Sequence, residues 1–307
     1  MSGPADELST LRDLLRYAVS RFREAGIVFG HGTTNALDEA AFLLLWGLNL
    51  PIDQLDPFVD ARLTRPEREK LLGLIEARIT TRKPAAYLTG EAWIGGHRFT
   101  VDERVIVPRS YIGELLTGEG LAVLDSSAPV DRILDLCTGS GCLAILAALA
   151  FPEALVDAVD LSAEALSVAR RNVAGYELEA RLRLFEGDLF GPVAGQRYDL
   201  ILSNPPYVTD AAVAAFPPEH AAEPGLAHAG GPDGLRIVRR LLGEACQFLN
   251  PTGQLLVEIG TRQAALAAEF PHLPFLWLDT KASSGEVFLL AAGDFTSPAA
   301  GKRRHRK

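Results

Sequence analysis

The sequence predicts an α/β domain with a mostly parallel sheet, preceded by a small helical domain and a β-hairpin. Apolar residues recur at helical spacing before about residue 90, a short alternating stretch around Gly95-Gly96 follows, and strand and helix patterns alternate from about residue 130. At roughly 100 to 200 residues per domain, 307 residues also suggest two domains. We expect a helical domain over 1–89, a hairpin linker over 90–108, the α/β domain over 109–295 and a disordered basic tail over 296–307.

The helical domain is predicted from three apolar stripes. The first two contain Leu8, Leu11, Leu15, Ala18 and Phe22, and then Ala41, Leu44, Leu45 and Leu48. The third follows a pair with capping-box spacing, Thr64 and Glu67, and contains Leu71, Leu72, Ile75 and Ile79. Pro84 is expected to end this third helix. Such stripes usually form a core, so they indicate a folded domain and say nothing about a ligand.

The α/β domain is predicted from the order of its segments. The strands are RILDL, VDAVDL, LRLFEGD, YDLILS, QLLVEIG and EVFLLAAG. The helices are YIGELL, which directly follows VPRS, then CLAILAALA, SAEALSVARRNVA and a segment over 233–249. Strands that alternate with helices of this length build a mostly parallel sheet covered on both faces.

Composition narrows the class of protein. Hydrophobic residues make up 48% and charged residues 22% of the chain, as in an ordinary globular protein. No apolar stretch reaches the roughly 18 residues of a membrane span, and the first residues lack the pattern of a secretory signal. The cysteines have no CxxC spacing, which favours neither a disulfide framework nor a metal site. We therefore expect a cytoplasmic protein that holds no metal.

The charge distribution disfavours nucleic acid as the main partner. The net charge is −9, and the terminal GKRRHRK carries five Lys and Arg, so the rest of the chain carries −14. Non-specific nucleic-acid binding comes largely from Lys and Arg that neutralise phosphates, so an acidic body opposes it. Two interpretations of the tail stay open, a weak contact with RNA and a solvated terminus.

The first candidate site is the segment Asp135 to Gly141, DLCTGSG, where a strand enters a helix. Glycines at such a turn let the backbone approach a ligand, and open α/β sheets bind ligands at the carboxyl ends of their strands. The segment predicts a nucleotide-like cofactor, although glycines also occur in turns for packing alone. It lacks the third glycine of a dinucleotide motif, which argues against a dehydrogenase, and the chain has no P-loop lysine pattern.

Asp160 is the second candidate, because it ends the next strand 19 residues after Gly141. An acid about 20 residues beyond a glycine-rich loop can accept hydrogen bonds from ribose hydroxyls. The alternative is that Asp160 only helps to cap the helix that begins near Ser162.

The most specific segment is Asn204-Pro205-Pro206-Tyr207, directly after the strand over 198–203. Two prolines stiffen the turn and remove two backbone donors, which leaves carbonyl oxygens without internal partners. The Asn204 side-chain oxygen and the Pro206 carbonyl could accept the two hydrogens of a substrate amide, with Tyr207 against the amide plane. Because an amide nitrogen is a poor nucleophile, fixing both hydrogens would direct its lone pair at an electrophile. The alternative is a stiff turn without a role in chemistry.

Together these segments resemble the class I, Rossmann-like methyltransferases of the HemK/PrmC type, a family of protein glutamine methyltransferases. The resemblance covers nearly all of residues 1–292. It implies S-adenosylmethionine as cofactor and methylation of a glutamine side-chain amide nitrogen in another protein. It implies that the catalytic residues are Asn204, Pro205, Pro206 and Tyr207. It implies that the cofactor is held by Asp135, Cys137, Thr138, Gly139, Ser140, Gly141, Asp160, Leu161, Asp188, Leu189 and Asn204.

Within this family, three segments are more similar to the PrmB branch, which modifies the third large-subunit ribosomal protein, than to the PrmC branch, which modifies peptide release factors. They are LDLCTGSGC, VPRS after residue 106, and the segment from Phe216 to Leu235, in which His220 replaces an expected tyrosine. The resemblance implies a ribosomal protein as substrate, free or within ribosome assembly intermediates.

Other functions stay open. Release-factor methylation shares every catalytic residue, and only the N-terminal domain and the segment after the Asn-Pro-Pro-Tyr motif can separate the two branches. An adenine-N6 DNA methyltransferase could use the same motif, but base flipping asks for a basic groove. A non-catalytic cofactor-binding protein would not need the Asn204 amide. Arg109 either meets the cofactor or substrate or lies at the surface, and Cys137 either packs the loop or acts as a nucleophile.

Overall fold

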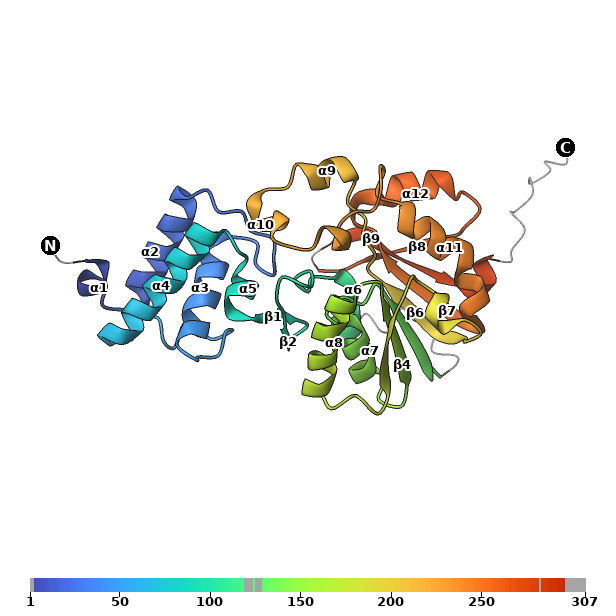
Figure 1. Ribbon diagram of the computed structural model, residues 1–307, viewed down its shortest axis with the longest axis horizontal. Coiled ribbons are helices and arrows are strands. Elements are labelled where there is room, and N and C mark those ends of the chain that lie inside the picture. The colour runs from blue at the N-terminus through green and yellow to red at the C-terminus, as the bar shows by residue number, and fades with distance from the viewer. Residues whose placement is uncertain (1–2, 119–123, 125–128, 282, 296–307) are drawn as a thin grey trace, which may run out of the picture. The chain divides into compact units, whose positions relative to one another are not determined.

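The computed structural model describes residues 3–118, 124, 129–281 and 283–295, which form two compact units (Figure 1). Unit 1 contains Met1–Ala92, Val101–Glu103 and Phe216–Glu223, and unit 2 contains the remainder of the chain. The tail expected over 296–307 lies outside the described residues.

Three helices of unit 1 form where the apolar stripes predict them. They are α2 (Leu11–Glu24), α3 (Ala36–Gly47) and α4 (Arg65–Thr81). Unit 1 also contains the short helices α1 (Pro4–Glu7), α5 (Ala85–Thr89) and α10 (Pro218–Ala221), which no stripe predicts. Glu67 accepts hydrogen bonds from the amide and hydroxyl of Thr64, which fixes the start of α4. α4 ends shortly before Pro84, where Arg82 turns into the left-handed region with φ of 61°. The apolar faces of α2, α3 and α4 share one core.

The buried face of α4 differs from the predicted stripe. Leu71 and Ile75 are buried as expected, whereas Leu72 and Ile79 are only partly buried. The face continues instead through Arg78, which is completely buried. A sequence pattern places arginine outside a core, because an unpaired buried charge is costly.

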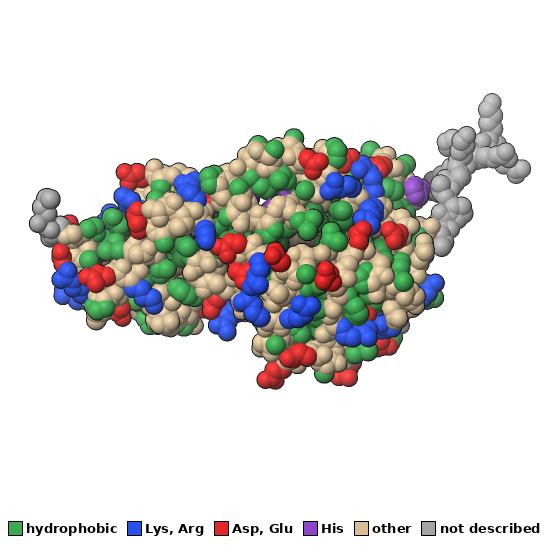
Figure 2. All heavy atoms as spheres, in the orientation of Figure 1, with side chains coloured by type: hydrophobic (Ala, Val, Ile, Leu, Met, Phe, Trp, Pro, Cys, Tyr) green, Lys and Arg blue, Asp and Glu red, His purple; other side chains and the backbone are tan. Residues whose placement is uncertain are grey.

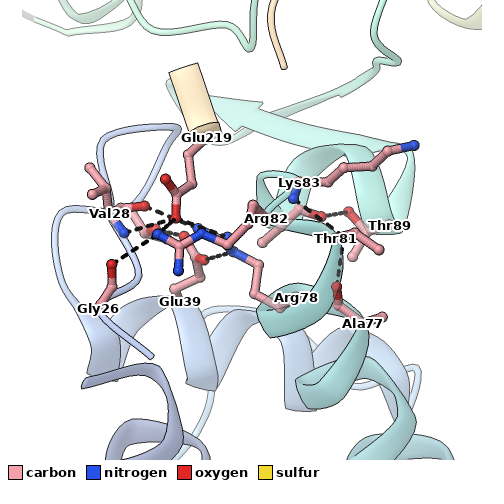
Figure 3. A network of polar contacts seen from close by, with 12 residues as sticks. Gly26, Val28, Glu39, Ala77, Arg78, Thr81, Arg82, Lys83, Thr89 and Glu219 are labelled. Carbon is pink, nitrogen blue, oxygen red and sulfur yellow. Dashed lines mark hydrogen bonds and ion pairs between the residues drawn. The ribbon is translucent and has the colours of Figure 1, made fainter. Parts of the chain in front are cut away.

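Arg78 is buried because carboxylates surround it (Figure 3). Its Nε donates to Oε1 of Glu39 at 2.5 Å, and its Nη1 lies 3.8 Å from Oε1 of Glu219. Glu219 also pairs with Arg82 at 2.8 Å, and both carboxylate side chains are fully buried. Glu219 belongs to α10, so Phe216–Glu223 folds with the N-terminal helices although the segment follows the Asn-Pro-Pro-Tyr motif in sequence.

The predicted hairpin is confirmed. Strands β1 (Glu91–Ile94) and β2 (His97–Thr100) form a two-stranded sheet. The turn between them is Gly95-Gly96, with φ of 59° and 80°. Two consecutive positive φ values are the geometry of a tight hairpin turn, which glycine adopts without strain.

Unit 2 contains a seven-stranded sheet in the order β5-β4-β3-β6-β7-β9-β8. The strands are β3 (Arg132–Leu136), β4 (Leu155–Asp160), β5 (Leu182–Glu186), β6 (Tyr198–Ser203), β7 (Leu249–Glu258), β8 (Leu276–Asp279) and β9 (Ser284–Ala291). The pairs from β5 to β7 are parallel, and β9 pairs antiparallel with β7 and β8. The prediction of a mostly parallel sheet is confirmed, and the strand order reverses between β3 and β6.

Helices cover both faces of this sheet (Figure 1). One core joins α6 (Tyr111–Thr117), α7 (Cys142–Ala150) and α8 (Ala163–Gly175) to alternate strand residues such as Ile133. The other joins α11 (Arg236–Phe248) and α12 (Gln263–Glu269) to the opposite set, such as Leu134. Shorter elements are α9 (Asp210–Ala214), η2 (Gly191–Val193), η3 (Gly225–Ala227), η4 (Gly260–Arg262) and η5 (Ala292–Phe295).

Several short elements of unit 2 escaped sequence analysis, among them β8 and α12. β8 has only four residues and lies at the sheet edge, between proline-containing turns and a polar stretch. α12 has seven residues and buries only Leu266. Elements this short carry too few repeats for their periodicity to be recognised. Across the described ranges, no helix has the length and apolar character needed to cross a membrane.

Candidate active site

The sheet places the two main sequence motifs on neighbouring strands. β3 leads into Asp135 to Gly141 and β6 leads into Asn204 to Tyr207. The strands are parallel, and Leu136 pairs with Ser203, so the next residues, Cys137 and Asn204, leave the sheet at the same level. Because the strand order reverses at this point, the two carboxyl ends flank the crevice in which such sheets bind ligands.

Asp135 holds the glycine-rich loop in shape. Its Oδ2 accepts the Thr138 hydroxyl at 2.5 Å and the Ala144 amide at 3.1 Å. Gly141, with φ of 79°, begins α7, and a Cβ there would lie 3.2 Å from the Cβ of Ala169. The loop therefore needs glycine both for its backbone and for the close approach of α8.

The other oxygen of Asp135 is available to a cation. Oδ1 is buried and has no hydrogen-bond partner among the described residues. Burial raises the pKa of this carboxyl to about 7, although the bonds from Thr138 and the Ala144 amide lower it. A nearby positive charge would favour the ionised form. The α-ammonium group of S-adenosylmethionine is such a charge, so the loop fits the cofactor that the sequence implies.

Asp160 ties the loop to the end of β4. Its Oδ2 accepts the Gly139 amide at 2.8 Å, and its Oδ1 accepts the Ser162 amide at 2.9 Å. The cap of α8 comes instead from the Ser162 hydroxyl, which accepts the Ala165 amide at 3.1 Å. Burial raises the pKa of Asp160. Capping therefore explains only part of what this carboxylate does, and its remaining lone pairs can still accept hydroxyls.

Three further residues implied for the cofactor site, Leu161, Asp188 and Leu189, differ in their surroundings. Leu161 follows Asp160 and is 56% exposed, so it offers apolar surface at the end of β4. Leu189 is buried, with φ of 47°. Both oxygens of Asp188 accept from the Arg240 guanidinium, at 3.0 Å and 2.9 Å. Sequence analysis did not predict this ion pair, which uses part of the hydrogen-bonding capacity of the Asp188 carboxylate.

The Asn-Pro-Pro-Tyr turn presents two acceptors. The Asn204 side-chain nitrogen donates to the Arg109 carbonyl oxygen over a long 3.4 Å, which orients the amide. Within the described part of the chain, neither Oδ1 of Asn204 nor the Pro206 carbonyl oxygen accepts a hydrogen bond. Both match the acceptors that the sequence predicts for a substrate amide.

Glycines pack closely around this turn. A Cβ on Gly230 would lie 2.7 Å from the Pro206 carbonyl oxygen, and one on Gly234 would overlap the Tyr207 carbonyl. On the other side, a Cβ on Gly260 would lie 2.7 Å from the Tyr207 ring. The Gly-Gly-Pro-Asp-Gly segment after the motif is therefore shaped by its contact with the motif.

Sequence analysis missed two polar residues of the site. Asn172 is buried in α8, where it donates to the Ser140 carbonyl at 2.9 Å and exchanges hydrogen bonds with the Thr100 backbone. Its signal was an asparagine within an apolar helix face. Glu258 is buried at the end of β7 and accepts the Tyr207 hydroxyl at 3.1 Å. Its signal was one acid within the run QLLVEIG.

The structure also bears on Cys137 and Arg109. Cys137 adopts φ of 62°, the region that favours glycine, and desolvation raises the pKa of its thiol. A thiol that stays protonated is a weak nucleophile, so packing is the better interpretation of Cys137. Arg109 is partly buried and donates to the Val107 carbonyl at 3.2 Å. Burial raises the pKa of Tyr207, and the charge of Arg109 opposes that rise. Arg109 therefore lies near the motif and not at a remote surface.

Comparison with known proteins identifies the family. A family model described as the methyltransferase small domain matches residues 120–217. Proteins named ribosomal protein uL3 glutamine methyltransferase are 57% identical in Bordetella pertussis and 53% in Burkholderia pseudomallei. The alignments cover 92% and 94% of this chain and 95% and 97% of those proteins. The chain belongs to the ribosomal protein uL3 glutamine methyltransferase family.

Membership of the uL3 glutamine methyltransferase family confirms the predicted class I methyltransferase and S-adenosylmethionine as its methyl donor. A third member, from Bradyrhizobium diazoefficiens, is 55% identical over 94% of this chain and 92% of its own. Among solved structures, a methyltransferase from Pyrococcus furiosus covers 75% of this chain and 99% of its own at 17% identity, with a TM-score of 0.47. That likeness is too distant to bear on function.

Proposed function

We propose that this chain transfers a methyl group from S-adenosylmethionine to the side-chain amide nitrogen of a glutamine in ribosomal protein uL3. The observation that carries the proposal is the stiff turn in which Asn204 Oδ1 and the Pro206 carbonyl oxygen accept no hydrogen bond from the described residues. Two such acceptors suit the two hydrogens of one amide. The names of relatives at 53% to 57% identity support uL3 as the substrate protein.

The protein contributes positioning more than base catalysis. S-adenosylmethionine supplies the methyl group when bound. Asn204 and the Pro206 carbonyl hold both hydrogens of the glutamine amide, and the Tyr207 ring packs against the amide plane. The nitrogen lone pair is then directed at the methyl group, and well-oriented reactions reach effective molarities of about 10⁵ to 10⁸ M. No strong base is needed before attack, because the proton becomes acidic once the nitrogen is methylated.

The cofactor contacts are part of the same proposal. Asp135 to Gly141 hold the methionine part, for which the unpartnered Oδ1 of Asp135 provides a binding atom. Asp160 holds the ribose, Asp188 lies on the adenine side, and Leu161 and Leu189 are further cofactor contacts. Asn204 lies where the methyl donor and the substrate amide meet.

Asp160→Ala should weaken S-adenosylmethionine binding by about 1 to 3 kcal/mol, because it leaves polar partners unpaired. Calorimetry measures this directly. The matched control is Asp199→Ala, which removes a carboxylate that accepts the Asp131 and Arg132 amides at the other end of the sheet. The control should lower stability and leave affinity unchanged. Equal affinity of wild type and Asp160→Ala would remove Asp160 from the ribose site.

Two alternative substrates are less well supported. Release factors would be modified by the same catalytic residues, but the relatives aligned over nearly the whole chain carry the uL3 name. A DNA adenine substrate requires a basic groove. On the face shown in Figure 2, acidic side chains lie among the basic ones and no continuous basic stripe is seen.

We also propose a role for each part of the chain. Residues 1–89 recognise the protein substrate, residues 90–108 link them to the methyltransferase domain over 109–295, and residues 296–307 form a basic tail. We place the reaction in the cytoplasm, on free uL3 or on ribosome assembly intermediates.

Mass spectrometry of cells that lack the enzyme tests the proposed substrate. uL3 should lose the mass of one CH2 group on a glutamine, and release factors should keep theirs. Purified enzyme should then methylate uL3 and leave a release factor and an adenine-containing DNA duplex unmodified. Methylated uL3 in the deletion strain would overturn the proposal. Loss of the methyl group from release factors would show that the enzyme acts on release factors instead.

Removal of residues 302–307 should leave turnover on free uL3 nearly unchanged, because the tail lies beyond the last strand. The comparison is repeated on ribosomal assembly particles at several salt concentrations. A loss confined to particles, steepest at low salt, would indicate phosphate contacts by the tail. A large loss on free uL3 would contradict the expectation and make the tail part of the docking surface.

A further inference from the structure

Glu258 is a buried acid at the edge of the proposed site. It ends β7, where the preceding Val257 pairs with Ser203, so Glu258 lies at the level of Asn204. Its residue is 1% exposed, and the three residues before it in the strand are buried and apolar. Burying a carboxylate is costly unless hydrogen bonds compensate. An acid at this strand position therefore needs a specific reason.

The reason is a set of donors that converge on both carboxylate oxygens. Oε1 accepts the Tyr207 hydroxyl at 3.1 Å. Oε2 accepts the Ser110 hydroxyl at 2.7 Å and the Tyr111 backbone amide at 2.8 Å. An ionised carboxylate only accepts hydrogen bonds, so it satisfies all three donors at once. A glutamine amide would turn its NH2 group toward at least one of them.

These contacts close a ring around the motif. The Arg109 carbonyl accepts from Asn204 and orients its amide. Ser110 and Tyr111, which follow Arg109, donate to Glu258. Glu258 in turn accepts from Tyr207. We propose that Glu258 is a positioning residue for methyl transfer, which fixes the Tyr207 ring and the first turn of α6 around the substrate amide. The inference rests on the proposed function, because it takes the amide to lie against Tyr207.

Because the positioning role requires the ionised form of Glu258, the rate of methyl transfer should depend on pH. Burial raises the pKa of Glu258 to about 7, opposed by the bonds from Ser110, the Tyr111 amide and Tyr207. Other charged groups also act on the side chains of Tyr111 and Tyr207. They are the acids Glu114 and Glu286 and the base Arg109. Only the ionised carboxylate accepts from all three donors. The rate of the chemical step should therefore fall as the pH drops through about 7.

Stability should change in the opposite direction. The folded-state pKa of Glu258 lies above the ordinary value of 4.5, so the unfolded chain binds fewer protons between these values. This carboxyl thus stabilises the fold at low pH, and its contribution is lost as the pH rises through about 7. A merely structural role would make activity follow stability, whereas a positioning role makes the two diverge.

Single-turnover kinetics of wild type and Glu258→Gln with saturating S-adenosylmethionine tests the inference. At pH 8 the variant should be on the order of 10- to 100-fold slower, as expected for a displaced reacting group. Its rate should no longer fall near pH 7, and KM for uL3 should stay within about twofold. Glu258→Asp, which keeps the charge, should restore the acid limb and part of the rate. A folded Glu258→Gln with wild-type rate, or with the acid limb intact, would overturn the inference.

Tyr207→Phe provides the second arm, and it decides the matter if Glu258→Gln does not fold. Without the Tyr207 hydroxyl the carboxyl loses a donor that lowers its pKa, so the acid limb should move to higher pH. Where Glu258→Gln does fold, the rate of the double variant should match that of Glu258→Gln alone, because both changes break one link. An unmoved limb, or additive losses, would contradict the inference.

Tyr198→Phe is the matched control. The Tyr198 hydroxyl donates to the buried Asp157 carboxylate at 2.8 Å, in the same sheet but at the first residue of β6. Its loss should lower stability and leave the rate and its acid limb unchanged. A wild-type enzyme that fails to methylate uL3 would contradict the proposed function, whereas an unaffected Glu258→Gln in an active enzyme would contradict only the role of Glu258.

Discussion

Asn204→Ala should lower the single-turnover rate of methyl transfer by about 10² to 10³, equivalent to about 2.7 to 4 kcal/mol, the usual cost of losing one positioned polar group. Alanine removes Oδ1, the proposed acceptor for one amide hydrogen. Affinity for S-adenosylmethionine should fall much less, because the glycine-rich loop and Asp160 provide most of the proposed contacts. Rates at saturating cofactor separate chemistry from binding.

Related substitutions refine this expectation. Asn204→Asp keeps the size of the side chain but places an oxygen against the Arg109 carbonyl, where Asn204 now donates. It should therefore also lower the rate strongly. Tyr207→Phe should be milder than Tyr207→Ala, because the ring packs against the amide while the hydroxyl acts through Glu258.

The control for Asn204→Ala is Asn250→Ala. Asn250 also uses its side-chain nitrogen, which donates to Asp199 at 2.6 Å, but it lies near the start of β7 and away from the motif. This variant should methylate uL3 at the wild-type rate. If Asn204→Ala does the same, amide positioning is wrong and the motif is only a stiff turn.

The sheet could be predicted because its strands and helices each repeat one pattern. RILDL and YDLILS are apolar runs of strand length, and the helices between strands show apolar faces of several turns. The parallel pairing followed from the alternation of strands and helices and not from any single strand. The antiparallel edge could not be predicted in the same way, since β8 and β9 are joined without a helix and β8 is short.

The site could be predicted only where its residues are contiguous. Asp135 to Gly141 and Asn204 to Tyr207 are motifs because one turn of backbone carries several functions. Glu258 contacts the motif from another strand, and its partner Ser110 is 148 residues away in sequence. No local spacing relates these positions. A buried acid in a strand nevertheless calls for partners, and this signal could have been followed.

The same limit applies to unit 1, where Arg78 looks like the solvent side of an amphipathic helix. Its burial depends on Glu39 in α3 and on Glu219, which is 141 residues later. The periodicity of α4 cannot indicate either partner, because both lie on other helices. The short α10 likewise has no stripe of its own, and its buried residue Glu219 pairs with Arg78 and Arg82 of unit 1.

Arg78→Met should therefore lower the free energy of unfolding of unit 1 by about 3 to 5 kcal/mol, because it leaves a buried carboxylate without its cation. Glu219 keeps Arg82 at 2.8 Å, so the uncompensated charge falls mainly on Glu39. Hydrogen exchange of the α3 and α4 amides reports on unit 1 separately, which matters because a chain of two units need not unfold in one step.

Adding Glu39→Leu to Arg78→Met should recover most of this loss, since the double variant no longer buries an unpaired charge at that point. The exposed pair of Arg12 and Asp60, with side chains 62% and 78% exposed, supplies the control. Arg12→Met should change the free energy of unfolding far less than Arg78→Met, because exposed ion pairs contribute little. If Glu39→Leu instead adds its own full cost to that of Arg78→Met, Arg78 stabilises unit 1 by the volume it fills and not by compensating Glu39.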